Sequence, residues 1–144
     1  TYWPARMQRL SEGPLVELLP ENSELWLDGG HNPAGGAAIA ATLAGMSTKP
    51  THIICGMLTT KDAGGFLGHL APQAQSFTAV TLNTEQNMLP AEELAQAASQ
   101  AGMKATASDS LLAAVSTLSA QQPGCRILIC GSLYLVGHIL QTNG

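Results

Sequence analysis

The sequence contains few charged and few aromatic residues. Of its 144 residues, 11% are charged and 4% are aromatic, and ten acidic residues outnumber six lysines and arginines for a net charge of −4. A chain with so few cations lacks the positively charged face that nucleic-acid phosphates require, so nucleic acid is excluded as the main partner. The low charged fraction also indicates that another domain or partner covers part of the exterior.

Signals for a membrane or for secretion are lacking as well. No apolar run approaches the roughly 18 residues that a membrane span needs, and no charged-then-apolar segment opens the chain. The three cysteines have neither Cys-x-x-Cys spacing nor paired histidines nearby, which argues against a zinc site. Cys55 and Cys130 end apolar runs, so we expect buried, reduced thiols and a cytoplasmic protein.

The sequence also lacks the Gly-x-x-x-x-Gly-Lys-Ser/Thr loop that cradles nucleotide phosphates. We identify no metal ligands. His52, His69 and His138 receive no functional assignment, because each lies in a pattern typical of a structural or surface histidine.

Length and an apolar fraction of 45% predict one globular domain over residues 1–144. Apolar runs that predict strands alternate with patterns that predict helices. The strands are expected at 25–27, 52–55, 77–82 and 127–130, and the helices near 35–46, 63–70, 91–101, 110–118 and 132–140. Such alternation is typical of right-handed βαβ crossovers. We therefore predict an α/β fold, a Rossmann-like three-layer sandwich with a mostly parallel sheet and helices on both faces.

Local patterns refine this prediction. Residues 15–19 are expected to add an antiparallel strand at the sheet edge, and residues 141–144 are expected to fray. Ser108 and Asp109 are expected to cap the following helix. The inward stripe of that helix is expected to consist of Leu111, Leu112, Val115 and Leu118.

The most informative stretch is the run LDGGHNP at residues 27–33, which lies between an apolar strand and a helical pattern. Open parallel sheets bind ligands at the carboxyl ends of their strands, where helix N-termini attract anions. Asp28 can accept hydrogen bonds from a ligand hydroxyl, or it can cap the turn by accepting backbone N–H groups. His31 is expected near the surface, as a ligand-contacting residue or a bystander. Pro33 suits the first turn of the helix.

Four separated blocks of the sequence resemble one family, in the order in which they occur. They are WPARMQ at residues 3–8, LDGGHNP at 27–33, Gly56 with TKD at 60–62, and GSLYLVG at 131–137. Together they resemble the C-terminal third of the folylpolyglutamate synthase/dihydrofolate synthase enzymes, which are members of the Mur ligase family. The resemblance implies a C-terminal domain of the Mur ligase type. It also implies that the central ATPase domain of such an enzyme, with its phosphate loop and magnesium ligands, precedes Thr1 and is absent from this chain.

The resemblance further implies a reaction and roles within it. Enzymes of this family transfer the γ-phosphoryl group of ATP to a carboxylate, and the amine of L-glutamate then attacks the acyl phosphate. By that likeness, Arg6 contacts the ATP phosphates as a catalytic cation. Asp28 accepts the ribose hydroxyls of ATP. His31 and Asn32 face glutamate and the phosphoryl end, and His31 is the second catalytic candidate.

Three further residues are substrate-binding candidates on the same likeness. Lys61 pairs with a carboxylate of the amino-acid substrate, and Ser132 and Tyr134 line the glutamate pocket at the start of the last helix. Each has a plain alternative: Lys61 as a solvated loop lysine, Ser132 as a helix N-cap, and Tyr134 as a packing residue. Two positions depart from the family pattern, since Ala5 replaces a glycine and Gly30 replaces an alanine. If that glycine adopts positive φ, alanine strains the turn before Arg6.

The expected function is that of the C-terminal domain of an ATP-dependent ligase that adds L-glutamate to folate or dihydropteroate. Its expected partners are ATP, the two substrates, the preceding ATPase domain, and Mg²⁺ held mainly by that domain. Two alternatives remain open at this point: another Mur-type amino-acid ligase, such as one of peptidoglycan synthesis, and a nucleotide-binding or regulatory module without catalysis.

Overall fold

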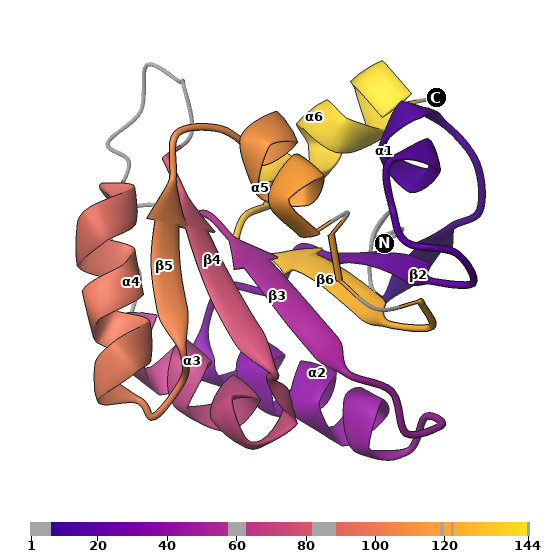
Figure 1. Cartoon of the computed structure of the whole chain (residues 1–144). Coiled ribbons are helices and arrows are strands. Elements are labelled where there is room, and N and C mark those ends of the chain that lie inside the picture. The colour runs from indigo at the N-terminus through magenta and orange to yellow at the C-terminus, as the bar shows by residue number, and fades with distance from the viewer. Residues whose placement is uncertain (1–6, 58–62, 82–88, 119, 122, 144) are drawn as a thin grey trace.

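The computed structural model describes residues 7–57, 63–81, 89–118, 120–121 and 123–143, apart from the side chains at 133, 134, 142 and 143. Within these residues, six strands form one sheet in the order β1-β2-β6-β3-β4-β5 (Figure 1). The strands are β1 (Gln8–Leu10), β2 (Glu24–Asp28), β3 (Thr51–Cys55), β4 (Ser76–Val80), β5 (Ala105–Ser108) and β6 (Arg126–Cys130). Strand β1 pairs antiparallel with β2, and the other neighbouring pairs are parallel.

Helices cover both faces of this sheet (Figure 1). One apolar cluster joins the sheet to α2 (Pro33–Ala44), α3 (Ala63–Leu70) and α4 (Ala91–Gln100). A second cluster joins the opposite face to α1 (Pro14–Glu17), α5 (Leu111–Leu118) and α6 (Leu133–Asn143). A short 3-10 helix, η1 (Ala71–Gln73), follows α3. The predicted three-layer α/β sandwich is therefore confirmed. Among the described residues, no helix is both long and apolar enough to cross a membrane.

The burial of the central strands explains why apolar runs in the sequence predicted them. All five residues of β3 and all five of β6 are buried. Strands that are covered on both faces carry continuous apolar side chains, as parallel strands in α/β proteins do. Strand β5 escaped prediction, because its sequence ATAS is short and partly exposed at the sheet edge.

Residues 15–19 were predicted as a strand, and this prediction is wrong. Pro14 occupies the first turn of helix α1 after Gly13, whose φ is +113°. Proline at that position suits a helix start, and glycine supplies the left-handed conformation before it. The antiparallel edge strand is β1 instead. The predicted fraying from residue 141 is also wrong, since α6 continues to Asn143.

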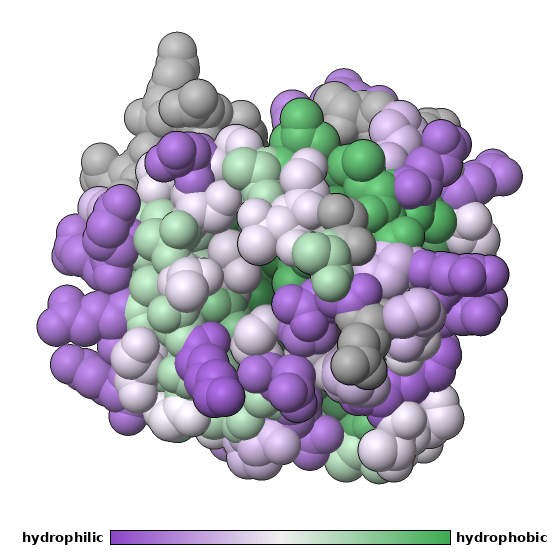
Figure 2. Space-filling view, viewed as in Figure 1, coloured by the Kyte–Doolittle hydropathy of each residue, from purple (hydrophilic) through white to green (hydrophobic). Residues whose placement is uncertain are grey.

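The residue that caps helix α5 lies one position after the predicted cap residues. The side chain of Ser110, rather than Ser108 or Asp109, accepts the N–H of Ala113 at 3.0 Å. Leu112 does not join the inward stripe, because it is 60% exposed. Figure 2 shows apolar residues gathered on this face of the molecule, where α1, α5 and α6 lie.

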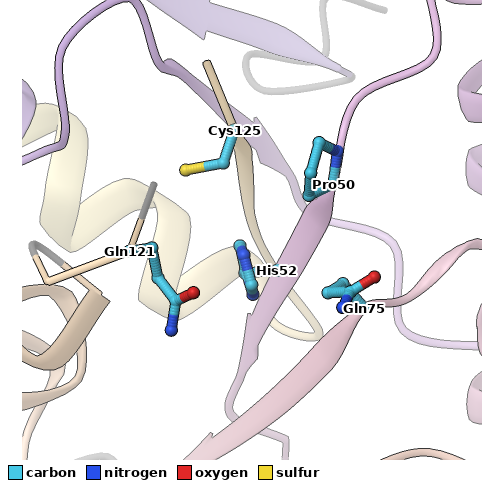
Figure 3. Close-up of a pocket in the computed structure, with 5 residues that line it drawn as sticks. All are labelled: Pro50, His52, Gln75, Gln121 and Cys125. Carbon is cyan, nitrogen blue, oxygen red and sulfur yellow. The ribbon is translucent and has the colours of Figure 1, made fainter. Parts of the chain in front are cut away.

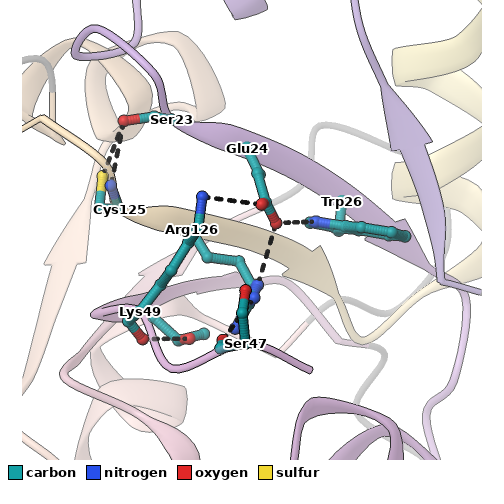
Figure 4. Close-up of polar contacts among 8 residues, drawn as sticks. Ser23, Glu24, Trp26, Ser47, Lys49, Cys125 and Arg126 are labelled. Carbon is teal, nitrogen blue, oxygen red and sulfur yellow. Dashed lines mark hydrogen bonds and ion pairs between the residues drawn. The ribbon is translucent and has the colours of Figure 1, made fainter. Parts of the chain in front are cut away.

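A polar network holds the amino ends of β2 and β6 together (Figure 4). Arg126 is 2% exposed; its Nε donates to Glu24 Oε1 at 3.2 Å and its Nη2 to the Ser47 carbonyl at 2.9 Å. Lys49 Nζ lies 2.9 Å from Glu24 Oε2, and Trp26 Nε1 donates to Glu24 Oε1 at 2.9 Å. Burial alone would raise the pKa of Glu24, but the hydrogen bonds from Lys49, Trp26 and Arg126 lower it to about 2. The buried guanidinium thus has a carboxylate partner that stays ionised in mild acid.

The turn between β6 and α6 requires a glycine. Gly131 has a φ of +104°, and a Cβ atom there would lie 2.5 Å from Cys55 Sγ and 2.7 Å from the Gly56 carbonyl oxygen. The turn is therefore constrained by its own backbone conformation and by the end of the neighbouring strand β3.

The Glu24 network predicts acid-sensitive stability. A pKa lowered from 4.5 to about 2 stabilises the fold fully above pH 4.5, and this contribution disappears as the pH falls through 2. We expect Glu24→Gln to lower the free energy of unfolding at pH 7 by up to about 3 kcal/mol, and by progressively less below pH 4.5. Urea unfolding at several pH values measures this. Glu21→Gln, at an exposed neighbouring position, is the control. A pH-independent difference between wild type and Glu24→Gln would contradict the prediction.

The geometry of the Gly131 turn predicts that a methyl group added at this position lowers the stability of the fold. Gly131→Ala is expected to destabilise the fold by at least about 2 kcal/mol, because alanine resists positive φ and its Cβ meets atoms that cannot easily move. Gly137→Ala is the matched control, since nothing lies within 4 Å of that position in the middle of α6. It should stabilise the helix by up to about 1 kcal/mol. Chemical denaturation of both variants measures the difference, and equal stabilities would refute the constraint.

Candidate functional site

The carboxyl ends of three neighbouring strands lie at one level of the sheet. The parallel register pairs Asp28 of β2 with Cys130 of β6, and Cys130 with Cys55 of β3. The loop after β2 leads to α2 on one face, whereas the loop after the adjacent β6 leads to α6 on the other. Open α/β sheets commonly bind ligands outside the carboxyl ends of adjacent strands whose connections diverge in this way.

Backbone hydrogen bonds bring parts of all four sequence blocks to this edge. The N–H of Gly131 donates to the Gly30 carbonyl at 3.1 Å, and the N–H of Gly56 donates to the Cys130 carbonyl at 3.3 Å. The N–H of Met7 donates to Asp28 Oδ2 at 3.0 Å. Blocks near residues 7, 30, 56 and 131 are therefore neighbours in space, as a shared site requires.

Asp28 is the polar centre of these contacts. It is 7% exposed, and its Oδ1 accepts the N–H of Gly30 at 2.7 Å while Oδ2 accepts the N–H of Met7. Charge-assisted bonds of this length are strong. The turn-capping alternative from the sequence is confirmed. The contact with Met7, whose φ is +45°, additionally fixes the segment that follows Arg6.

Asn32 and His31 occupy the loop that follows. Asn32 is the N-cap of α2, because its Oδ1 accepts the N–H of Gly35 at 2.8 Å, and Pro33 lies in the first turn as predicted. With Oδ1 engaged in this way, the Asn32 amide presents its N–H₂ as the remaining donor. His31 is half-buried, and its Nδ1 lies 3.2 Å from the Gly29 carbonyl oxygen.

Ser132 lies at the start of α6 and is 4% exposed. Its Oγ accepts the N–H of Leu135 at 3.4 Å, so the N-cap alternative has a structural basis. The predictions for Arg6 and Lys61 lie outside the described residues, as does the side chain of Tyr134. Their positions in the chain are still informative: Arg6 precedes Met7 directly, and Lys61 follows the carboxyl end of β3.

Two buried thiols lie at this edge. Cys55 and Cys130, which end β3 and β6, are unpaired and buried, as predicted, and Cys125 at the opposite edge is unpaired and buried too. The pKa of the Cys130 thiol lies well above its usual range, because it hydrogen-bonds to the Cys55 thiol, is buried and faces the charge of Asp28. A thiol with a raised pKa stays protonated and unreactive.

The charge distribution separates the two edges of the sheet. Of the four described cations, Lys49 precedes β3, Lys104 precedes β5 and Arg126 begins β6, so these three lie at amino ends of strands. The fourth, Arg9, is exposed in the middle of the edge strand β1. The carboxyl edge instead receives the N-termini of α2 and α6, whose dipoles favour anions. In the part of the chain that the structure describes, no group of three His, Cys, Asp or Glu side chains can hold a metal ion.

Two contributors to this edge were missed by the sequence reasoning. Met7 contributes a backbone N–H and Gly131 a left-handed turn, and neither depends on side-chain chemistry. The position of Gly131, directly between an apolar strand and a serine that opens a helix, is a signal that could have identified the turn. No local signal marks Met7.

Comparisons with known proteins agree with this arrangement. Residues 6–133 match the Mur ligase, glutamate ligase domain family. A folylpolyglutamate synthase from Lacticaseibacillus casei is 28% identical over 142 residues, which are 99% of this chain but 30% of that protein. The chain thus spans about a third of the length of the curated relative that it matches.

Solved structures show the same fold. A Mycobacterium tuberculosis folylpolyglutamate synthase complexed with ADP superposes with a TM-score of 0.82 at 24% identity, over 97% of this chain and 32% of that one. A bifunctional folylpolyglutamate synthase/dihydrofolate synthase with Mn, AMPPNP and L-glutamate bound gives a TM-score of 0.77 at 23% identity, over 97% and 31%. Because the family match runs through nearly all of the chain, from residue 6 to residue 133, this protein belongs to the Mur ligase family and carries its glutamate ligase domain.

Proposed function

We propose that this chain is the C-terminal domain of an ATP-dependent ligase that adds L-glutamate to folate or dihydropteroate through an acyl phosphate. The observation that carries the proposal is the meeting of parts of the four sequence blocks at the carboxyl ends of β2, β6 and β3. Relatives with this fold support it, since one was solved with ADP and another with AMPPNP, Mn and L-glutamate.

The chemistry requires cations and donors at a closed site. A carboxylate becomes reactive toward an amine when the ATP γ-phosphoryl group converts it to an acyl phosphate. The amine of glutamate then forms the amide bond and phosphate leaves. Positioned cations offset the charge that develops on the transferred group, and closure by a separate domain excludes water.

The described residues fit the nucleotide end of such a site. Asp28 is buried at the carboxyl end of β2, and a carboxylate can accept ribose hydroxyls as well as backbone N–H groups. Asn32 offers its N–H₂ group to the phosphoryl end, because its Oδ1 caps α2. His31, beside it, faces the incoming glutamate in this proposal.

The cations are assigned by the family likeness and by their place in the chain. Arg6 directly precedes Met7, and Lys61 follows the carboxyl end of β3. We assign Arg6 to the ATP phosphates and Lys61 to a carboxylate of glutamate.

The remaining assignments concern the substrate and the rest of the enzyme. Ser132 and Tyr134 bind glutamate at the start of α6. We assign Mg²⁺ and the phosphate loop to a preceding ATPase domain, since this chain covers 31% of the relative that was solved with Mn and AMPPNP. The three unpaired thiols suit the reducing cytoplasm, where we place the enzyme.

Ligation assays test the proposal directly. The protein that contains this chain together with an ATPase domain should incorporate labelled L-glutamate into folate or dihydropteroate only when ATP is present. The chain alone should neither ligate nor hydrolyse ATP. Nucleotide binding without ligation by the longer protein would instead favour a regulatory module.

Arg6 is expected to act on catalysis more than on substrate binding. In the longer protein, Arg6→Ala should lower kcat by roughly a hundredfold, equivalent to about 3 kcal/mol, while the KM for glutamate changes little. Arg9→Ala, three residues away on the exposed side of β1, is the matched control and should leave kcat unchanged. Steady-state kinetics of both variants decides, and an unaltered kcat for Arg6→Ala would assign Arg6 to the surface.

Ser132 is expected to act on glutamate binding. Ser132→Ala should raise the KM for glutamate about tenfold or more and leave the KM for ATP unchanged, because it removes a hydrogen bond to a charged group. Ser110→Ala is the matched control, since Ser110 caps α5 in the same manner far along the chain. Loss of an N-cap alone costs about 1 kcal/mol of stability. If both variants lower the melting temperature and neither changes glutamate saturation, Ser132 is only a cap.

A further inference from the structure

A cavity of about 250 Å³ opens at the amino ends of the strands, on the edge of the sheet opposite Asp28. It is lined by Pro50, His52, Gln75, Gln121 and Cys125 (Figure 3). These residues come from the starts of β3, β4 and β6 and from the segment after α5. None of them belongs to the four blocks that form the candidate site, so the cavity is a separate feature of the fold.

His52 is a buried hydrogen-bonding group of this cavity. It is 4% exposed, and its Nδ1 lies 2.7 Å from Ser76 Oγ, which fixes the orientation of the ring. Among the described residues, Nδ1 has this partner and Nε2 has none. Burial lowers the pKa of His52 below its usual value, so the ring is neutral at neutral pH.

Two amides lie on either side of this ring. Figure 3 shows His52 between Gln121 and Gln75. Within the described part of the chain, neither glutamine side chain makes a hydrogen bond, so each offers a carbonyl oxygen and an N–H₂ group. Cys125 adds a thiol, with its Sγ 3.3 Å from Ser23 Oγ. The cavity therefore combines several donors and acceptors in a small volume.

Among the described residues, no charged side chain lines the cavity. The adjacent Arg126 belongs to the Glu24 network, with its guanidinium bonded to Glu24 and to the Ser47 carbonyl. A carboxylate or phosphate would lose its hydration here without gaining a cation, which is unfavourable. Pockets for drug-sized molecules occupy roughly 300 to 1,000 Å³, so about 250 Å³ suits a molecule of one or two rings.

We propose that this cavity binds a small uncharged heterocycle whose edge alternates hydrogen-bond donors and acceptors, as nucleobases and cyclic amides do. Gln75 and Gln121 pair with that edge, as glutamine amides pair with adenine. His52 Nε2 provides the fixed third contact at the base of the cavity. This site is independent of the proposed ligase chemistry at the opposite edge.

Titration of the chain with adenine, uracil and nicotinamide, which carry neither phosphate nor carboxylate, tests the proposal by calorimetry and NMR. At least one should bind with a Kd of roughly 0.1–1 mM, as a small ligand with a few hydrogen bonds would. Acetate and inorganic phosphate should not bind. Gln75→Ala and Gln121→Ala should each weaken binding about fivefold. Gln100→Ala, an exposed glutamine on α4, is the matched control and should have no effect.

Alkylation of the cysteines gives a second measurement that needs no variant. Cys125 is 2% exposed and lines the cavity, whereas Cys55 and Cys130 are 0% exposed in the sheet and do not line it. Iodoacetamide should modify Cys125 first, and a saturating heterocycle should slow that modification at least fivefold. The proposal is overturned if none of the three compounds binds at 10 mM (roughly tenfold above the weakest expected Kd). The proposal is also overturned if a compound binds with the same Kd to both glutamine variants and does not slow the alkylation of Cys125, because the compound then occupies another site.

Discussion

The parallel register of β2, β6 and β3 is the constraint on which the rest of the structure depends. It places Asp28, Cys130 and Cys55 at one level, so that the loops after all three strands emerge together. A shift of one residue in this register would turn every side chain of a strand to the opposite face. Because β3 and β6 are buried on both faces, such a shift would disrupt both apolar clusters. The core thereby fixes the geometry of the candidate site.

Asp28 connects the end of strand β2 to two backbone segments of the candidate site. Its carboxylate stands at the end of a buried strand and holds two backbone N–H groups, one in its own loop and one at Met7. The residue thus has a structural function whether or not a ribose hydroxyl also binds it. In the proposed ligase, the hydrogen bond from Met7 orients the segment after Arg6 relative to the nucleotide. The Asp28 side chain would then both bind the ribose of ATP and position this segment.

The two edges of the sheet carry different polar arrangements. At the amino edge, the buried Arg126 is neutralised by Glu24, and this pair stabilises the start of the central strands. At the carboxyl edge, Asp28 and two helix N-termini provide the local electrostatics. A buried ion pair is stable only when all of its hydrogen bonds are made, whereas a ligand site needs groups that can still bind a ligand. In this sheet the ion pair lies at the amino edge and the candidate ligand site lies at the carboxyl edge.

The sequence by itself determined the α/β class, the central strands, the helices α2 to α6 and the proline in the first turn of α2. These features depend on local periodicity and turn chemistry, which neighbouring residues specify. The family likeness also singled out LDGGHNP and GSLYLVG, and the N–H of Gly131 in the second block donates to the Gly30 carbonyl in the first. Only the tertiary structure decided that residues 15–17 form a helix, that β1 is the antiparallel edge, and that Met7 binds Asp28. It alone joined Gln75, Gln121, His52 and Cys125 around a cavity. Each of these depends on which distant segments pair and pack, and no short stretch of sequence encodes that choice.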